Sequence, residues 1–242
     1  MGGYGISPER TKSDNKLALL EEKAMDNIMD YEDVDSWNTI ILLYNSALKE
    51  IGTKLEILND EFQHVHQYNP IEHIKSRIKT PESIVKKLKR RGYEVSVSNM
   101  VKYVNDIAGV RIICSFTSDI YRIADMLARQ NDIRVISIKD YIKNPKDSGY
   151  KSFHMIVSVP IFLSHETMET KVEIQIRTVA MDFWASLEHK INYKYDGTVP
   201  EHIKRELGEC AEMVSDLDAK MMSLNEEIKE HGKESETFAQ AG

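Results

Sequence analysis

The stretch Lys171-Val172-Glu173-Ile174-Gln175-Ile176-Arg177 alternates polar and apolar side chains without a break. Successive side chains of a β-strand point to opposite faces, so this segment places its valine and isoleucines on one face. Glu173, Gln175 and Arg177 then share the other face. A strand of this kind is typical of a sheet with one covered face. Its polar face is either an ordinary half-solvated surface or the floor of a site.

The rest of the middle of the chain also favours a sheet. Residues 109–116, 134–141 and 153–163 are β-rich, and residues 118–130 have a helical pattern. A short polar loop at residues 164–169 predicts an antiparallel hairpin, and hence a mixed sheet. We predict an α/β fold of the α+β type, with a central mixed β-sheet of about five strands flanked by helices.

Long helices are predicted at both ends of this sheet. Apolar side chains recur at helical spacing from residue 35 to residue 63, and a last helix is expected at residues 200–230. A further helix should follow Thr178. We expect a single domain over residues 16–230, with disordered tails at residues 1–15 and 231–242.

Composition limits the class of protein. The 242 residues are 41% hydrophobic, which is enough for one sizeable core. No apolar run approaches the roughly 20 residues that cross a bilayer, and no N-terminal signal pattern is present. We therefore expect a soluble, cytoplasmic protein with no membrane partner. The two cysteines, Cys114 and Cys210, provide neither a disulfide framework nor a metal knuckle.

A strongly basic segment lies at residues 73–91, although the whole chain has a formal net charge of -7. It carries many Lys and Arg residues and a single carboxylate, so an anionic ligand is expected there. Thr80, Pro81 and Gly92 favour a helix over its second half, which would hold these cations on a rigid element. The segment is either a nucleic-acid footprint or a cradle for nucleotide phosphates.

Two acids could complement these cations. Asp106 lies where a polar helix end passes through a glycine into a strand, and Glu173 lies on the polar face of its strand. Together they could hold a hard cation such as Mg²⁺ through oxygen ligands. The alternative roles are ordinary ones, since Asp often caps a helix or forms a turn, and Arg111 could be a surface strand residue.

The loop at residues 143–154 combines cations, a glycine and an aromatic ring. Tyr150 beside Lys146 and Lys151 suits a nucleotide, because the ring can stack on a base while the ammonium groups meet phosphates. The loop is equally compatible with an exposed hairpin connection that packs its tyrosine. A lone histidine such as His154 is more often structural than catalytic. The sequence contains neither a P-loop nor a dinucleotide-binding glycine motif, so any nucleotide site must use side-chain cations.

Five motifs occur in this order: HIKSRIK at residues 73–79, DIAGVR at 106–111, GYKSFH at 149–154, EIQIRT at 173–178 and MDFWASLEH at 181–189. Their combination resembles the ppGpp synthetase domain of the RelA/SpoT homologues, in particular the small alarmone synthetases of the RelP/RelQ type. The resemblance extends over roughly residues 35–230.

The resemblance implies a GTP pyrophosphokinase, which transfers the β,γ-pyrophosphate of ATP to the 3′-hydroxyl of GDP or GTP and releases AMP. It implies Mg²⁺ as the cofactor, Asp106 and Glu173 as metal ligands, and Glu173 as a catalytic base as well. The residues implied for ATP binding are Arg77, Lys79, Ser83, Lys87, Arg90, Arg91 and Arg111. Those implied for GTP or GDP binding are Lys139, Lys146, Tyr150, His154, Gln175 and Glu188.

The resemblance also implies a homotetramer assembled through the terminal helices, although their apolar stripes could instead be buried within one subunit. The chain lacks the hydrolase domain of the bifunctional relatives, so it should make alarmone without degrading it. Lys139 and Lys151 stand where relatives often have Arg, and Asp182 stands where some have Asn. The alternative is a regulatory module that binds RNA or nucleotides without catalysis. This alternative does not explain why Asp106 and Glu173 accompany the cations. RNA or alarmone could also bind as an effector.

Overall fold

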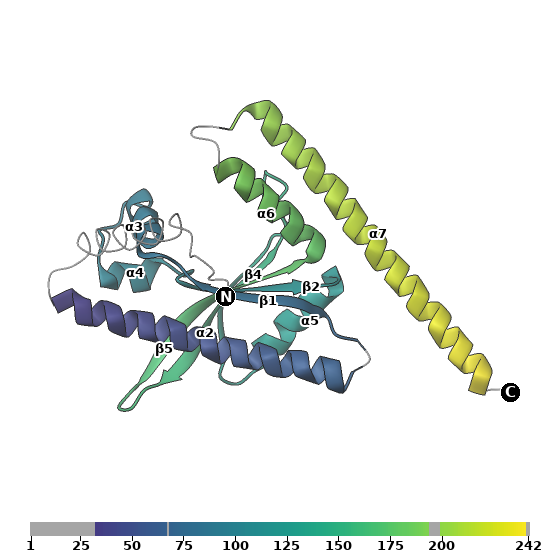
Figure 1. Cartoon of the computed structure of the whole chain (residues 1–242), viewed down its shortest axis with the longest axis horizontal. Helices are drawn as coiled ribbons and strands as arrows, with labels where there is room; N and C mark the ends of the chain where they lie inside the picture. Colours follow the sequence, from purple (N-terminus) through teal and green to yellow (C-terminus); the bar gives the residue numbers. More distant parts are fainter. Residues whose placement is uncertain (1–31, 67, 194–198, 241–242) are drawn as a thin grey trace, which may run out of the picture.

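The computed structural model describes residues 32–66, 68–193 and 199–240, and Figure 1 shows their arrangement. The elements in chain order are α2 (Glu32–His64), β1 (Ile71–Ile78), α3 (Pro81–Arg90), α4 (Val97–Tyr103), β2 (Ala108–Cys114), α5 (Thr117–Ala128), β3 (Arg134–Asp140), β4 (Phe153–Phe162), β5 (Thr167–Thr178), α6 (Val179–Tyr193) and α7 (Glu201–Gln240). The tail expected at residues 1–15 lies outside the described residues.

The five strands form one mixed sheet in the order β1-β2-β5-β4-β3. β2 and β5 run parallel, and the other neighbouring strands are antiparallel. β4 and β5 make the expected hairpin, in which Phe162 pairs with Thr167. The predicted fold class is therefore confirmed.

The alternation in β5 determines which side of the sheet is covered. Val172, Ile174 and Ile176 are fully buried in the main core, together with side chains of α2 and α5. Figure 1 shows α2 crossing the sheet. Among these helical side chains, Leu55 of α2 and Ile123 of α5 are also fully buried. The opposite face of β5 is left for polar side chains, as the sequence pattern predicts.

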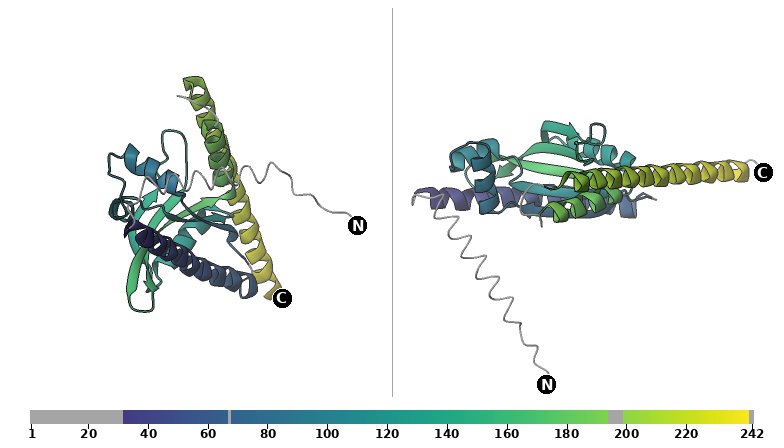
Figure 2. Two further views of the ribbon diagram at one scale, coloured as in Figure 1. Left: turned by 60° about the vertical axis from the view of Figure 1, so that its left-hand side comes forward. Right: turned by 90° about the horizontal axis from the view of Figure 1, so that it is seen from above.

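The two C-terminal helices lie at one side of this body. α6 and α7 pack along each other through a small cluster of Trp184, Ala185 and Ala211, and the indole Nε1 of Trp184 donates to the carbonyl of Leu207 at 3.0 Å. Figure 2 shows the length of α7 extending along the edge of the molecule. α7 continues to Gln240, beyond the predicted end at residue 230. The predicted domain limits stay predictions.

β1 was not expected from the sequence, because the first half of the basic segment lacks a strict period of two. Only Ile71 is buried in this edge strand, and the pairing with β2 shifts register between Ile71 and His73. The second half forms α3 as predicted, with Pro81 in its first turn and Gly92 at φ 75° after its end. No helix of the described residues is long and apolar enough to cross a membrane.

Candidate nucleotide site

A row of polar side chains crosses the open face of the sheet. Its register pairs Lys75 of β1 with Arg111 of β2, Arg111 with Gln175 of β5, Gln175 with His154 of β4, and His154 with Lys139 of β3. Directly paired residues share a face, so these five side chains stand on one side. Residues predicted for ATP and for the acceptor therefore lie toward opposite edges of one surface.

Asp106 lies at the base of the β1 and β2 side, where two lysines hold its carboxylate. The Nζ atom of Lys79 is 3.0 Å from Oδ2, and the Nζ atom of Lys87 is 2.7 Å from Oδ1. The three side chains are between 15% and 19% exposed. Burial acts to raise the pKa of Asp106, but the two lysines outweigh it and hold that pKa below its ordinary value. Its carboxylate is ionised at neutral pH.

Glu173 lies beside it on β5, at the centre of the sheet. Its Oε2 accepts a hydrogen bond of 2.8 Å from Nε2 of Gln175, and its Oε1 lies 3.6 Å from Nδ1 of His154. Burial acts to raise the pKa of Glu173, while these two contacts lower it, and the pKa is below its ordinary value overall. The charge of Asp106 opposes that lowering, and both acids line the same cleft. The fold therefore brings together two acids whose proximity the sequence could not establish, and the roles predicted for them stay predictions.

A cleft of about 260 Å³ contains this acid pair. Its lining comes from β1, β2, β5 and the turn before β2, and consists of Lys75, Ser76, Arg77, Asp106, Gly109, Val110, Arg111, Glu173 and Gln175. The Nε of Arg111 is buried, and it has no hydrogen-bond partner within the described ranges. Burial, aided by the charges of Arg177 and Arg77, lowers the pKa of Arg111. An orphaned donor among crowded cations favours an anionic ligand.

Three of the residues predicted for the acceptor, Lys146, Tyr150 and His154, lie close together. The hydroxyl of Tyr150 is 2.9 Å from Nε2 of His154, and the Nζ of Lys146 lies 4.3 Å from the centre of the Tyr150 ring. Tyr141 meets the rings of both Tyr150 and His154 edge to face. His154 connects this aromatic and basic cluster to Glu173, whose Oε1 lies 3.6 Å from Nδ1 of His154. The predicted stacking of Tyr150 on a base stays a prediction.

Sequence reasoning did not assign Arg177 to the site, yet its guanidinium is central to it. Nη2 donates to the Tyr150 hydroxyl at 2.7 Å and to Oε1 of Gln175 at 3.1 Å, while Nη1 pairs with Asp182 at 3.0 Å. Asp182 also pairs with Nη1 of Arg111 at 3.2 Å. The alternation of β5 signalled that Arg177 shares the face of Glu173. It did not signal that Arg177 is only 4% exposed.

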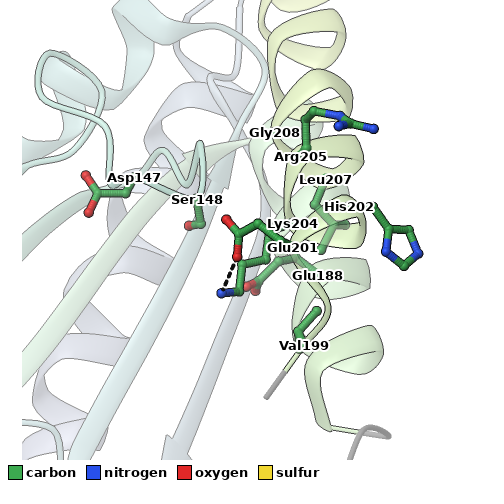
Figure 3. A pocket seen from close by; sticks show the side chains of 10 residues that line it. All are labelled: Asp147, Ser148, Glu188, Val199, Glu201, His202, Lys204, Arg205, Leu207 and Gly208. Atoms are coloured by element: carbon green, nitrogen blue, oxygen red, sulfur yellow. Dashed lines mark hydrogen bonds and ion pairs between the residues drawn. The ribbon is translucent and has the colours of Figure 1, made fainter.

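Other predicted residues lie away from the cleft lining. Ser83 and Arg90 are exposed on α3, and Arg91 donates from Nη1 to the carbonyl of Tyr103 at 2.8 Å. Glu188 lines a separate cavity of about 880 Å³, which lies between α6, the first turns of α7 and the loop that carries Ser148 (Figure 3). The roles predicted for these four residues stay predictions.

The acid pair suits Mg²⁺ better than a cation that needs a full protein cage. No group of three or more His, Cys, Asp or Glu side chains positioned to hold a metal occurs in the part of the chain that the structure describes. Mg²⁺ is commonly held by one or two carboxylates, with waters and substrate phosphates as its other ligands. Asp106 and Glu173 fit such a donor set, provided that a lysine releases one oxygen of Asp106.

Comparison with known proteins agrees with this geometry. Residues 76–198 match the model of the region found in RelA/SpoT proteins. The GTP pyrophosphokinase YwaC of Bacillus subtilis is 48% identical over 195 residues, which cover 81% of this chain and 93% of YwaC. The crystal structure of small alarmone synthetase 2 from Bacillus subtilis matches with a TM-score of 0.72 and 47% identity, covering 79% of this chain and 98% of that one.

A further crystal structure shows small alarmone synthetase 1 from Bacillus subtilis bound to its product pppGpp. It matches with a TM-score of 0.74 and 36% identity, covering 80% of this chain and 98% of that one. These similarities extend over nearly the whole length of the relatives, and they confirm the resemblance carried by the five motifs. The chain belongs to the RelA/SpoT family and, within it, to the small alarmone synthetases.

Proposed function

We propose that the protein is a GTP pyrophosphokinase that transfers the β,γ-pyrophosphate of ATP to the 3′-hydroxyl of GTP or GDP, which gives pppGpp or ppGpp and AMP. The observation that carries this proposal is the position of Glu173, between a cationic wall on β1 and α3 and an aromatic, basic side on β4 and its preceding loop. Membership of the RelA/SpoT family and the similarity to YwaC, a GTP pyrophosphokinase, support the same reaction.

We assign ATP to the wall formed by β1, β2 and α3. Lys75, Arg77 and Arg111 line the cleft, and Lys79 and Lys87 stand at its base with Asp106. Two polyphosphates repel each other, so a reaction between them requires cations that offset their charge and stabilise the leaving oxygen of AMP. The wall holds Lys75 and Arg77 on β1, Arg111 on β2 and Lys87 on α3, so regular elements fix the backbone positions of these cations.

We propose that Asp106 and Glu173 hold Mg²⁺ together with the phosphates of ATP. Bound there, the ion would neutralise charge that develops on the transferring phosphoryl groups. Each oxygen of Asp106 is in contact with a lysine, at 3.0 Å for Lys79 and 2.7 Å for Lys87. Phosphate offers these ammonium groups an alternative partner, so binding of ATP would free the carboxylate for the metal.

We assign the acceptor to the side of Tyr150, where the ring stacks on guanine, and Lys139 and Lys146 meet the phosphates. Glu173 takes the proton of the 3′-hydroxyl. The 3′-oxygen then bonds to the β-phosphorus of ATP, and the bond from that phosphorus to the oxygen of AMP breaks. The contacts from Gln175 and His154 keep Glu173 ionised, which both its base and its metal-ligand roles require.

We further propose that the cytoplasmic enzyme assembles as a homotetramer through its C-terminal helices. Large apolar side chains are exposed at helical spacing on both helices: Val179, Phe183, Leu187 and Ile191 on α6, and Met213, Leu217, Met221, Leu224 and Ile228 on α7. Such continuous stripes are typical of a contact with another subunit. Leu217→Glu should lower the molar mass measured by light scattering, whereas an unchanged mass would contradict this use of α7.

The reaction is tested with purified protein, ATP, GTP or GDP and Mg²⁺, and nucleotides are separated by ion-exchange chromatography. Synthesis requires AMP and the 3′-pyrophosphorylated guanosine nucleotide in equal amounts. Glu173→Gln should lower kcat by about 100-fold or more while both nucleotides still bind, because it removes the charge and keeps the size. Glu169→Gln, in the same strand but outside the cleft lining, is the matched control and should keep its activity.

Two outcomes would contradict this proposal, one for the role of Glu173 and one for the reaction as a whole. Full turnover by Glu173→Gln would remove Glu173 from the chemistry. Salt-sensitive RNA binding without any synthesis would favour the nucleic-acid reading of the basic segment.

A further inference from the structure

Arg177 is a buried charge that uses all three of its nitrogens. Besides the bonds of Nη1 to Asp182 and of Nη2 to Tyr150 and Gln175, its Nε donates to Oγ of Ser152 at 3.3 Å. A buried ion pair contributes little net stability compared with well-packed apolar side chains. Its position therefore calls for a reason beyond folding.

The contacts of Arg177 close a ring around the acceptor side of the site. Starting from the carboxylate, the ring runs through Glu173, Gln175, Arg177, Tyr150 and His154 and returns to Glu173. The five side chains come from β5, β4 and the loop before β4. The ring thus joins the residue proposed as the base to the residue proposed to stack on guanine.

Arginine sets the direction of every hydrogen bond in this ring, because a guanidinium donates and cannot accept. Gln175 must turn its carbonyl oxygen to Arg177, which leaves its NH₂ group to donate to Glu173. The Tyr150 hydroxyl accepts from Arg177, so its single proton is given to Nε2 of His154. A neutral His154 must then carry its proton on Nδ1, which is the atom that faces Glu173.

We propose that Arg177 is a positioning residue for pyrophosphate transfer, which orients Glu173 through Gln175 and fixes the Tyr150 ring and the His154 tautomer. The inference rests on the proposed function for the roles of Glu173 and Tyr150. Arg177 itself is 4% exposed and is not part of the cleft lining, so it acts through these residues. A guanidinium is required, because an ammonium lacks the planar fork that serves Gln175, Tyr150 and Asp182 at fixed angles.

Asp182 makes this role separable from ATP binding. It pairs with Arg177 at 3.0 Å and with Arg111, on the ATP side, at 3.2 Å. When Arg177 is replaced, Asp182 keeps Arg111 as a partner, so the cleft that would receive ATP should remain. The loss should therefore concentrate in kcat and in the KM for the acceptor.

The kinetic test compares Arg177→Lys and Arg177→Met with the unmodified enzyme. We expect both variants to lower kcat by on the order of 10- to 100-fold and to raise the KM for GTP, because misplacement of a reacting group by about 1 Å costs that much. The KM for ATP should change little. If charge balance for Asp182 were the only role, Arg177→Lys would restore normal kinetics, and this result would overturn the proposal.

A second readout does not depend on activity. Nitrogen-15 NMR of histidine-labelled protein, assigned with His154→Gln, should show His154 protonated on Nδ1 and bare on Nε2. Tyr150→Phe and Arg177→Lys should each shift that balance toward the Nε2-protonated tautomer. Two results would refute the proposal that Arg177 fixes the His154 tautomer. One is a His154 that is protonated on Nε2 in the unmodified protein, and the other is a tautomer balance that neither variant changes. An inactive enzyme with the expected tautomer would instead count against the proposed reaction alone.

Discussion

Replacement of Asp106 by Asn tests whether the paired lysines are held by this single carboxylate. Two ammonium groups lie 3.0 Å and 2.7 Å from its oxygens, and all three side chains are less than one-fifth exposed. Even at the dielectric constant of water, two unit charges about 3 Å apart attract by about 1.4 kcal/mol. Desolvation offsets part of the two contacts, so we expect Asp106→Asn to lower the free energy of unfolding by about 2 kcal/mol.

Urea unfolding at neutral pH, without nucleotide or metal, measures this loss, which corresponds to a Tm lower by about 4–8 °C. Because the folded-state pKa of Asp106 is depressed, its contribution is present above the unfolded-state pKa and is lost as the pH falls through the folded-state value. The difference between the two proteins should therefore disappear in acid.

The same substitution should strengthen the binding of metal-free ATP. Without the carboxylate, Lys79 and Lys87 are released to phosphates, and a gain of about 1.4 kcal/mol would tighten binding about tenfold in calorimetry with EDTA. The control is Asp132→Asn, whose 2.6 Å partner is Lys54 but whose side chain is 49% exposed. It should cost less than about 1 kcal/mol and leave ATP binding unchanged. Equal stability of Asp106→Asn and the unmodified protein, or weaker metal-free ATP binding, would refute the reasoning.

Two further substitutions probe how α7 supports the acceptor side. In Gly149→Ala, the new Cβ would lie 2.5 Å from Cβ of Ala211 at a φ of 84°, so we expect a loss of about 1–3 kcal/mol in urea unfolding and a higher KM for GTP. Gly92→Ala has a φ of 75° but no atom within 4 Å of the new Cβ, and should cost less. In Asp218, burial raises the pKa although Thr178 donates to its carboxylate. A carboxyl group whose pKa is raised in the folded state stabilises the fold at low pH, and this stability is lost as the pH rises. Asp218→Asn should therefore be more stable than the unmodified protein at neutral pH and equally stable in acid. A variant that is destabilised at neutral pH would contradict this.

Much of the fold could be predicted from the spacing of apolar residues, because burial of one face of a strand or helix makes apolar residues recur at a fixed interval. The alternation of β5 predicted both its buried face and its polar face, and the polar loop after β4 predicted the hairpin. β1 was not predicted because it is an edge strand with a register shift. Most of its side chains are not buried, so its sequence need not alternate between apolar and polar residues. Its cations became meaningful only when pairing with β2 placed them beside the acids.

Site residues could be predicted where one motif includes the reactive side chain. Contacts that depend on the pairing of distant segments could not be predicted. Asp106 and Glu173 were predicted as a pair, but their proximity comes from the parallel alignment of β2 with β5. The ring through Arg177 also depends on alignment, since it needs the β4–β5 register and a loop that folds back over it. The sequence shows the type of each residue and the face of the strand on which it lies, whereas the strand order determines which side chain lies next to it.

The most direct measurement of the central claim follows the phosphates of ATP. ATP labelled with ³²P at the β-phosphate is incubated with the protein, Mg²⁺ and unlabelled GTP, and the products are separated. We predict that the label passes entirely into pppGpp and that the AMP formed in equal amount carries none, because the β–γ unit moves intact to the 3′-oxygen. Label recovered in ADP, or AMP formed without labelled pppGpp, would contradict the account.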